Sequence, residues 1–491
     1  MSYTPPDPAR WARSRAHQAA MHRLVPGGAH TYARGDDQMP EAMPVVIARG
    51  HGCRVEDVDG NRYIEYGMGL RAVTLGHAEP RVTAAAAEWL ARGVGFSRPA
   101  SIEREAAEAF LDLIPGAERV KFCKDGSSAT TAAVKLARAA TGRDTVAVCH
   151  EHPFLSQDDW FIGTTDMDAG IPQAVRDLTV AFPYGDLDAL AAVLDAQPRS
   201  GTGAVACVVM EATRGAGDPA AYLHAAQALC RARGAVFVLD EMITGFRWHA
   251  RGAQGLYGLT PDLSTFGKAL ANGFSVSALA GRADLMDLGG MTTDRDRVFL
   301  LSSTHGAETH ALAAAVAAMT ITRDDDPVGV MDRAGARLRR GAEQAIAAAG
   351  VSGFVGVAGR DSNLVFTTAD AAGRPSQPYR TLMLQELTRR GILGPSFVVS
   401  AAHDDAAVDE TVDAFAAACR VYRDALDAGS VEPFGVGRPV QPAIRRASGT
   451  VWTSPAPAKS APANPASPTS ARAPSSTTSG AFPIHSHTPS S

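Results

Sequence analysis

Short Val-rich runs alternate with Ala-rich stretches through the middle of this 491-residue chain, and this alternation limits the possible folds most strongly. Continuous apolar runs of this length are typical of strands buried on both faces, with helices between them. The pattern predicts an α/β fold in which a mostly parallel central sheet has helices on both faces. Ligands bind beyond the carboxyl ends of such strands, so functional residues should follow the strands. The expected strands are 119–123, 145–149, 204–210 and 235–240, and the expected helices between them are 129–140 and 222–233.

The remaining chain predicts a smaller α+β unit and a tail. An Asp59-Gly60 turn indicates a hairpin near the N-terminus. Pro, Ser, Ala and Thr dominate the last fifty residues, and such a composition favours disorder. We therefore expect an N-terminal segment (1–65) that packs with the small domain, a large domain (66–325), a small domain (326–435) and a disordered tail (440–491).

Composition restricts the partners and the location of the chain. The formal net charge is −5, which does not favour nucleic acid as a partner. No run approaches the ~18 apolar residues of a membrane span, and the first residues lack the order of a signal peptide. We expect a cytoplasmic protein with no membrane partner. The six cysteines have no paired spacing, so we expect reduced thiols and no metal site.

Two residues in the predicted large domain suggest a cofactor. Asp240 ends a buried strand, and Lys268 follows within the small-residue run Gly-Lys-Ala-Leu-Ala-Asn-Gly. An acid at a strand end and a nearby lysine are what an enzyme needs to hold pyridoxal 5′-phosphate (PLP), with the acid on the ring nitrogen and the amine on the aldehyde. The pair therefore predicts a Lys268 Schiff base with PLP. For Asp240, capping of the following turn is the alternative.

A second segment is a candidate phosphate site. The run from Asp125 to Ala129 follows a strand and opens a helix, whose free N–H groups and dipole favour anions. Gly126 permits close backbone approach, and Ser127 offers a hydroxyl. An ordinary helix N-cap is the alternative interpretation of the same residues.

These motifs resemble those of the class III PLP-dependent aminotransferases, closest to glutamate-1-semialdehyde 2,1-aminomutase and its relatives. The likeness rests on Asp240-Glu241-Met242-Ile243-Thr244-Gly245-Phe246-Arg247, the Lys268 segment, Asp57-Val58-Asp59-Gly60-Asn61 and Val25-Pro26-Gly27-Gly28. It covers residues 22 to about 425. The resemblance implies the PLP-dependent transferase fold type I and a homodimer whose active sites lie at the subunit interface.

The resemblance also implies roles for single residues around the cofactor. Gly126 and Ser127 inherit phosphate binding, although Asp125 and Ser128 depart from the Ser-Gly-Thr-Glu-Ala pattern of relatives. Thr304 matches the residue that reaches the phosphate across the dimer. Three further residues are expected beside the cofactor: Phe154 stacked on one face of the ring, with His152 as second choice, Met242 on the other face, and Glu211 nearby.

Two arginines are expected on the substrate side. Arg34 matches the position that holds the substrate carboxylate in the aminomutase, and a guanidinium can clamp such a group with two hydrogen bonds. Arg71 replaces the usual residue types of relatives, and we expect it to recognise a second anionic group. A solvated surface role is the alternative for either arginine.

Together these features predict a PLP-dependent aminotransferase that moves an amino group from a donor to a keto or aldehyde acceptor. An aminomutase of the glutamate-1-semialdehyde type, which shifts the amine within one substrate, is the first alternative. An amino-acid racemase on the same fold is the second. A binding module that keeps only the fold is disfavoured by the presence of both Asp240 and Lys268.

Overall fold

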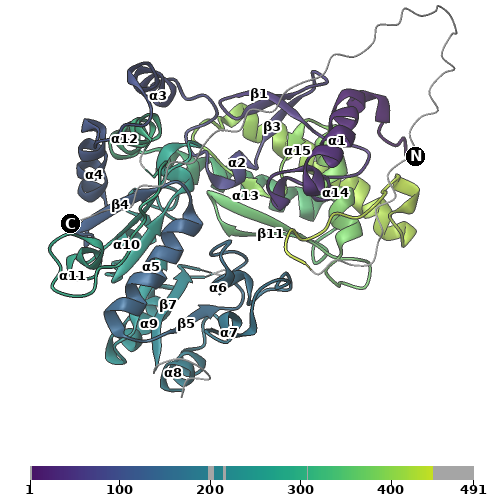
Figure 1. Cartoon of the computed structure of the whole chain (residues 1–491). Coiled ribbons are helices and arrows are strands. Elements are labelled where there is room, and N and C mark those ends of the chain that lie inside the picture. The colour runs from purple at the N-terminus through teal and green to yellow at the C-terminus, as the bar shows by residue number, and fades with distance from the viewer. Residues whose placement is uncertain (1–2, 197–203, 214–216, 307, 446–491) are drawn as a thin grey trace, which may run out of the picture. The chain divides into compact units, whose positions relative to one another are not determined.

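A seven-stranded sheet with the strand order β4-β10-β9-β8-β7-β5-β6 forms the centre of the larger part of the chain (Figure 1). Five neighbouring strands, from β9 to β6, run parallel, and β10 is antiparallel to both β9 and β4. The mostly parallel sheet expected from the alternating pattern is thus confirmed. The strands are β4 Arg119–Cys123, β5 Thr145–Cys149, β6 Thr179–Phe182, β7 Val205–Glu211, β8 Val236–Asp240, β9 Leu263–Phe266 and β10 Ser277–Gly281.

Helices pack on both faces because successive strand residues point to opposite sides. On β8, Val236 and Val238 join a buried cluster with α5, whereas Phe237 and Leu239 join another with α9. The helix expected at 129–140 begins earlier, because Asp125 caps its first turn. The helices of this part are α3 Pro80–Arg92, α4 Ser101–Leu113, α5 Gly126–Thr141, α6 Asp159–Ile162, α7 Gln173–Arg176, α8 Leu187–Asp195, α9 Ala220–Ala232, α10 Gly252–Tyr257, α11 Ala283–Met286 and α12 Thr309–Asp324.

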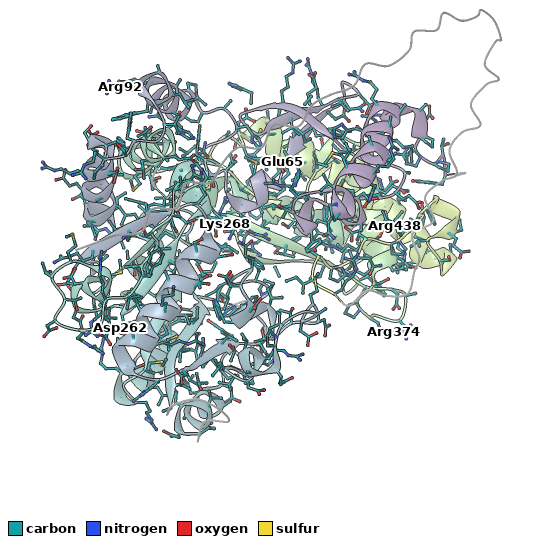
Figure 2. The ribbon with its side chains drawn as sticks, in the orientation of Figure 1. Glu65, Arg92, Asp262, Lys268, Arg374 and Arg438 are labelled. Atoms are coloured by element: carbon teal, nitrogen blue, oxygen red, sulfur yellow. The ribbon has the colours of Figure 1, made fainter. Side chains whose placement is uncertain are left out.

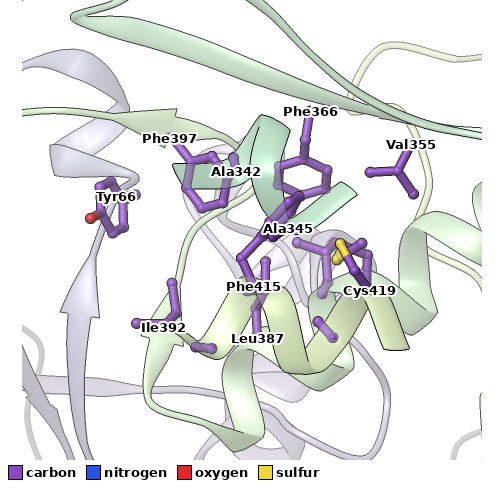
Figure 3. Packing of buried hydrophobic residues seen from close by; sticks show 14 of the residues in the cluster. Tyr66, Ala342, Ala345, Val355, Phe366, Leu387, Ile392, Phe397, Phe415 and Cys419 are labelled. Carbon is purple, nitrogen blue, oxygen red and sulfur yellow. The ribbon is translucent and has the colours of Figure 1, made fainter. Parts of the chain in front are cut away.

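A second core lies between a three-stranded sheet and three long helices. The antiparallel strands have the order β11-β12-β14, and their apolar face packs on α13, α14 and α15. Figure 3 shows Phe366, Phe397 and Phe415 in this core, where the ring centroids of Phe397 and Phe415 lie 5.6 Å apart. The elements are β11 Val355–Arg360, β12 Asn363–Thr368, β14 Phe397–Val398, α13 Pro327–Ala348, α14 Gln377–Arg389 and α15 Asp405–Ala428.

The N-terminal segment joins this second part through a four-stranded sheet, β1-β2-β3-β13. Strands β2 and β3 form the expected antiparallel hairpin. The Asp59 carboxylate of its turn accepts hydrogen bonds from the backbone N–H groups of Arg13 and Ser14, which attaches helix α1 to the hairpin. The elements are α1 Ala12–Leu24, β1 Ile47–His51, β2 Arg54–Asp57, β3 Arg62–Glu65 and β13 Ile392–Leu393.

The computed structural model describes residues 3–196, 204–213, 217–306 and 308–445. The predicted tail lies outside the described residues from position 446 onward, so its disorder stays a prediction, as do the domain boundaries near 65, 325 and 435. Among the described helices, none combines the length and apolar character needed to cross a bilayer.

Candidate active site

Three polar residues form a row across the carboxyl ends of neighbouring parallel strands. Glu211 ends β7 and pairs in register with Asp240, the last residue of β8. Asp240 pairs in turn with Thr265 of β9. Lys268 comes two residues after β9 ends, so the topology brings the two residues of the predicted cofactor pair to one edge of the sheet. Figure 2 labels Lys268 near the middle of the molecule.

The Asp240 carboxylate is buried, and one of its two oxygens accepts hydrogen bonds from the protein. Its Oδ1 accepts hydrogen bonds from the Met242 N–H at 2.9 Å and from the Thr265 hydroxyl at 3.1 Å. Asp240 therefore also caps the turn that follows its strand, which was the alternative role expected for it. The second oxygen, Oδ2, accepts no hydrogen bond from the described residues and is available to a ligand. Burial, and then the nearby Glu211 carboxylate, raise the pKa of Asp240 to about 7, against the lowering effect of Lys268.

Lys268 occupies an unusual backbone position with little space around it. Its φ of 41° lies in the left-handed region, which non-glycine residues adopt mainly where the surrounding structure enforces it. A Cβ at the preceding Gly267 would lie 2.5 Å from the Ser277 hydroxyl oxygen, so only glycine fits there. Burial lowers the pKa of the Lys268 amine, and the Asp240 carboxylate opposes this shift. Desolvation of this kind favours the neutral amine, which is the nucleophilic form.

Asn272 fixes the turn that carries Lys268. Its side-chain oxygen accepts the N–H groups of Thr74 and Leu75 at 3.0 and 2.9 Å, and its amide nitrogen donates to the Gly76 carbonyl at 2.9 Å. Asn272 itself is left-handed, with a φ of 48°. Asn272 was expected only as part of the Lys268 motif, although an Asn-Gly pair is the signal that indicates such a turn.

The predicted phosphate segment combines a capped helix start with free amides. Asp125 Oδ1 accepts the Ser128 N–H at 2.9 Å, so the N-cap interpretation is correct for this carboxylate. The N–H groups of Gly126 and Ser127 make no hydrogen bond with the described residues. The Ser127 hydroxyl oxygen accepts the Gln157 N–H at 3.0 Å, which leaves its own proton free to donate. Two amides and one hydroxyl therefore remain for an anion, beside the Asp125 carboxylate.

Met242 packs against both glycines of the site. A Cβ added at Gly126 would lie 2.8 Å from the Met242 sulfur, and one at Gly267 would lie 2.7 Å from it. The structure thus brings the predicted phosphate segment, the Lys268 turn and the Asp240 loop together around one buried methionine.

Of the two candidates for ring stacking, His152 is buried and Phe154 is not. The Nε2 of His152 accepts the Glu211 N–H at 3.0 Å, so the proton of a neutral ring sits on Nδ1, 3.4 Å from the Glu211 carboxylate. Phe154 is 47% exposed, and its ring meets only the edge of Phe161, with centroids 6.1 Å apart. The structure therefore places His152 and Glu211 in direct contact and Phe154 at the surface.

Arg71 ends a left-handed turn. Met68, Gly69, Leu70 and Arg71 have positive φ angles of 42°, 59°, 59° and 72°. L-residues disfavour this conformation, so other contacts must stabilise it. The Arg71 Nε donates to the Asn363 side chain at 3.1 Å, whereas its terminal nitrogens make no hydrogen bond with the described residues.

Arg247, the last residue of the Asp240 motif, supports this turn. Its fully buried guanidinium donates to the carbonyls of Arg71 at 3.1 Å and Val399 at 2.8 Å, and more weakly to those of Ser362 and Val73. No carboxylate in the described residues pairs with it. Burial lowers the pKa of Arg247 to about 9. Arg247 was expected only as part of the Asp240 motif, with no function of its own, because its partners come from segments far away in the chain.

Arg34 and Arg71 line the same cavity, which has a volume of about 650 Å³. Its walls come from the N-terminal segment, the left-handed turn and the residues around Gly394. Arg34 is exposed, and its guanidinium makes no hydrogen bond with the described residues. The two predicted substrate residues therefore open into one cavity. Thr304, by contrast, lies in an exposed turn, and no hydrogen bond between described residues joins its side chain to the other predicted site residues.

The chemistry of these groups fits PLP. The free Asp240 oxygen suits a protonated ring nitrogen, the desolvated Lys268 amine suits an aldehyde, and the free N–H groups at the start of α5 suit a phosphate. A cation beside Asp240 and Glu211 would also offset the repulsion between these two acids.

Comparison with known proteins agrees with this fit. The family description "Aminotransferase class-III" matches residues 32–360. Glutamate-1-semialdehyde 2,1-aminomutase of Roseiflexus castenholzii is 35% identical over 85% of this chain and 99% of its own. The FumI protein of a Sphingopyxis species, solved with PLP, superposes with a TM-score of 0.77 at 26% identity over 86% of this chain and 99% of its own. An omega-transaminase of Sphaerobacter thermophilus gives a TM-score of 0.73 at 26% identity over 84% of this chain and 98% of its own. The chain belongs to the class III aminotransferases and is a PLP-dependent enzyme of fold type I.

Proposed function

We propose that this enzyme transfers an amino group between an amino donor and a keto or aldehyde acceptor, with Lys268 and Asp240 as its catalytic residues. The observation that carries the proposal is their placement at the ends of adjacent parallel strands, with the Lys268 amine desolvated and one Asp240 oxygen uncommitted. PLP supplies an aldehyde that condenses with amines and a ring that accepts an electron pair from the substrate.

In this proposal each residue has one task. Lys268 would hold the cofactor through its aldehyde, and its amine would carry a proton to and from the substrate carbon. Its lowered pKa supports this task, because a neutral amine is the form that accepts a proton. Asp240 keeps the ring nitrogen protonated. Met242 and His152 would contact the ring. Glu211 fixes the orientation of His152, which we place ahead of Phe154 as the stacking residue because it is buried.

The phosphate is assigned to the start of α5. Gly126 and Ser127 donate their N–H groups, and Ser127 adds its hydroxyl. We further propose a homodimer in which Thr304 donates to the phosphate bound by the partner subunit; its exposed position in the single chain is compatible with that role. We place the enzyme in the cytoplasm.

The substrate is proposed to carry a carboxylate and a second anionic group. Arg34 would bind the first and Arg71 the second, since both residues line the shared cavity and Arg71 has two uncommitted nitrogens. A charge-assisted bidentate contact at each arginine would orient the reacting carbon relative to Lys268.

The test is transfer of amino groups from single donors. Purified enzyme loaded with PLP is mixed with L-alanine or L-glutamate, and the keto acid released per active site is measured without and with an added keto acceptor. About one keto acid per site without acceptor, and many with it, supports a transaminase. Lys268→Ala should abolish both, while Lys135→Ala, at an exposed lysine, should abolish neither. Full turnover by Lys268→Ala would refute the proposed mechanism.

The aminomutase reaction is the second candidate, because the Roseiflexus relative carries that name. It predicts complete conversion of glutamate-1-semialdehyde alone into its isomeric amino ketone, with no second substrate. A racemase would instead exchange the α-proton with deuterated water without releasing a keto acid.

A further inference from the structure

The loop that carries Arg34 has little internal structure. Residues 29–39 form two short 3₁₀ turns, Tyr32–Arg34 and Asp36–Gln38, closed by isolated backbone hydrogen bonds such as Gly35 N–H to the Tyr32 carbonyl at 2.9 Å. Such turns are too short to hold a conformation by themselves. We call residues 29–39 the Arg34 loop; its position depends on what binds it from outside.

A segment near the far end of the described chain is well anchored. Residues 435–445, the C-terminal strap, follow α15 and the short turn Glu432–Phe434. The Val440 N–H donates to the Thr381 hydroxyl of α14 at 2.9 Å, and the Val440 side chain is buried. Just before the strap, the Phe434 carbonyl accepts the Gln385 amide at 2.8 Å. The strap therefore starts from a fixed base on α14.

The strap binds the Arg34 loop through backbone and side-chain groups. The Gln441 N–H donates to the Asp37 carbonyl at 3.0 Å, and the Gln38 side chain donates back to the Gln441 carbonyl at 2.8 Å. Two arginines add charged contacts. The guanidinium of Arg438, labelled in Figure 2, donates to the Asp36 carbonyl at 3.2 Å, and Arg445 forms an ion pair with Asp37.

These contacts also neutralise acids close to Arg34. Asp36 lies 3.6 Å from Arg438 and 3.3 Å from the His22 ring, and the Glu41 carboxylate accepts the Arg438 N–H at 3.0 Å. Without the strap, the Asp36 and Asp37 carboxylates would lose their arginine partners, while Asp36 stays 3.3 Å from the His22 ring and Asp37 accepts the Gln38 amide at 3.2 Å. Each carboxylate would then compete for the Arg34 guanidinium of the same loop. An arginine paired in this way is less available to a substrate anion.

From these contacts we infer that the C-terminal strap is a positioning element for substrate binding: Arg438, Gln441 and Arg445 hold the Arg34 loop so that its guanidinium faces the cavity unpaired. They act through the loop and touch no reacting group. The inference rests on the proposed role of Arg34 in carboxylate binding.

The test uses the full-length, PLP-loaded enzyme and two amino donors of similar shape. L-alanine carries the carboxylate that Arg34 would bind, and isopropylamine has a methyl group in its place. The Arg438→Ala/Arg445→Ala variant should raise KM for L-alanine about three- to tenfold, the equivalent of one or two hydrogen bonds. Its kcat, and its kcat/KM for isopropylamine, should stay within twofold. Arg374→Ala, which removes an exposed arginine paired with Asp370, is the matched control and should change neither.

A second measurement does not depend on turnover. Amide hydrogen exchange without substrate should be faster across residues 29–39 in the double variant and unchanged in the control. The reciprocal exchange Asp37→Arg/Arg445→Asp keeps an ion pair between strap and loop and should recover most of the KM for L-alanine.

Arg34→Ala separates failure of the inference from failure of the proposed function. If Arg34→Ala leaves KM for L-alanine unchanged, the proposed role of Arg34 is wrong. If Arg34→Ala raises it, but the strap variant changes neither KM nor exchange in the loop, the strap has no positioning role and the inference is overturned.

Discussion

Replacing Asp240 by Asn should make the cofactor-free enzyme more stable at high pH while it impairs catalysis. The carboxylate is buried, and its pKa is raised from 3.8 to about 7. In the unfolded chain the group loses its proton near its ordinary pKa, whereas in the folded protein it keeps the proton until about pH 7. The free energy of unfolding therefore falls as pH rises between these values, and the full penalty is present above the folded pKa.

The size of the effect follows from the shift. A difference of about three pKa units corresponds to about 4 kcal/mol at most, at about 1.4 kcal/mol per unit. Asparagine is uncharged at all these pH values, and its oxygen can still accept the hydrogen bonds from Met242 and Thr265. Asp240→Asn should therefore raise the free energy of unfolding by about 2–4 kcal/mol at pH 8 and by much less at pH 4.

The assay is urea unfolding of the cofactor-free parent and variant at several pH values. Because Asp240 interacts with Lys268 and Glu211, the difference between the two curves reports the titration of Asp240 together with its coupling to these two groups. Asp195→Asn is the control: Asp195 is exposed, and its hydrogen bond with Arg233 lowers the pKa, so any pH-dependent difference should have the opposite sign. A stability difference that is the same at pH 4 and pH 8 would refute the reasoning.

Three further predictions concern the cofactor, the substrate and the left-handed turn. Gly126→Ala introduces a Cβ 2.8 Å from the Met242 sulfur. We expect about tenfold weaker PLP binding, measured by titration of cofactor absorbance. Gly95→Ala, at a position with open space and no positive φ, should leave PLP binding unchanged. Arg71→Ala should raise KM for L-glutamate about tenfold or more through loss of a charge-assisted contact. KM for norvaline, which has a methyl group in place of the side-chain carboxylate, should not change. An equal effect on both substrates would exclude Arg71 from anion recognition. Arg247→Met leaves the carbonyls of Arg71 and Val399 without their donor and should lower the free energy of unfolding by about 2–4 kcal/mol. Urea unfolding measures this change, with Arg374→Ala as the control variant. Stability equal to that of the parent would show that the left-handed turn does not need Arg247.

The sheet and the placement of the Asp240–Lys268 pair were predictable because both depend on local patterns. Each pattern is contained in a few consecutive residues: one is a buried strand followed by an acid, and the other is a lysine among small residues. Asp125 was harder to interpret, because one carboxylate can cap the helix while its neighbours keep free amides. The sequence offered these two roles as alternatives. In the structure Asp125 caps the helix while the Gly126 and Ser127 N–H groups make no hydrogen bond with the described residues, so phosphate binding there stays a prediction.

Other parts of the site depend on residues far apart in the chain. Arg247 binds carbonyls contributed by segments near residues 71 and 399, and no local pattern indicates such partners. The choice between His152 and Phe154 likewise depends on burial, which follows from the packing of β5 beside β7. The predicted role of Thr304 is not tested by the structure of a single chain, since its predicted partner belongs to a second subunit.

The charges around Lys268 explain why such a site is costly without its cofactor. Two neighbouring acids, Asp240 and Glu211, are buried, and burial followed by their mutual repulsion raises the pKa of Asp240. The cations that could neutralise them are a desolvated lysine and Arg71, each with a lowered pKa. A cationic ring placed against Asp240 would relieve this imbalance, and the relief appears only when the ring is bound. The stability gained by Asp240→Asn in the empty protein is therefore a measure of the electrostatic free energy that the folded enzyme holds available for PLP.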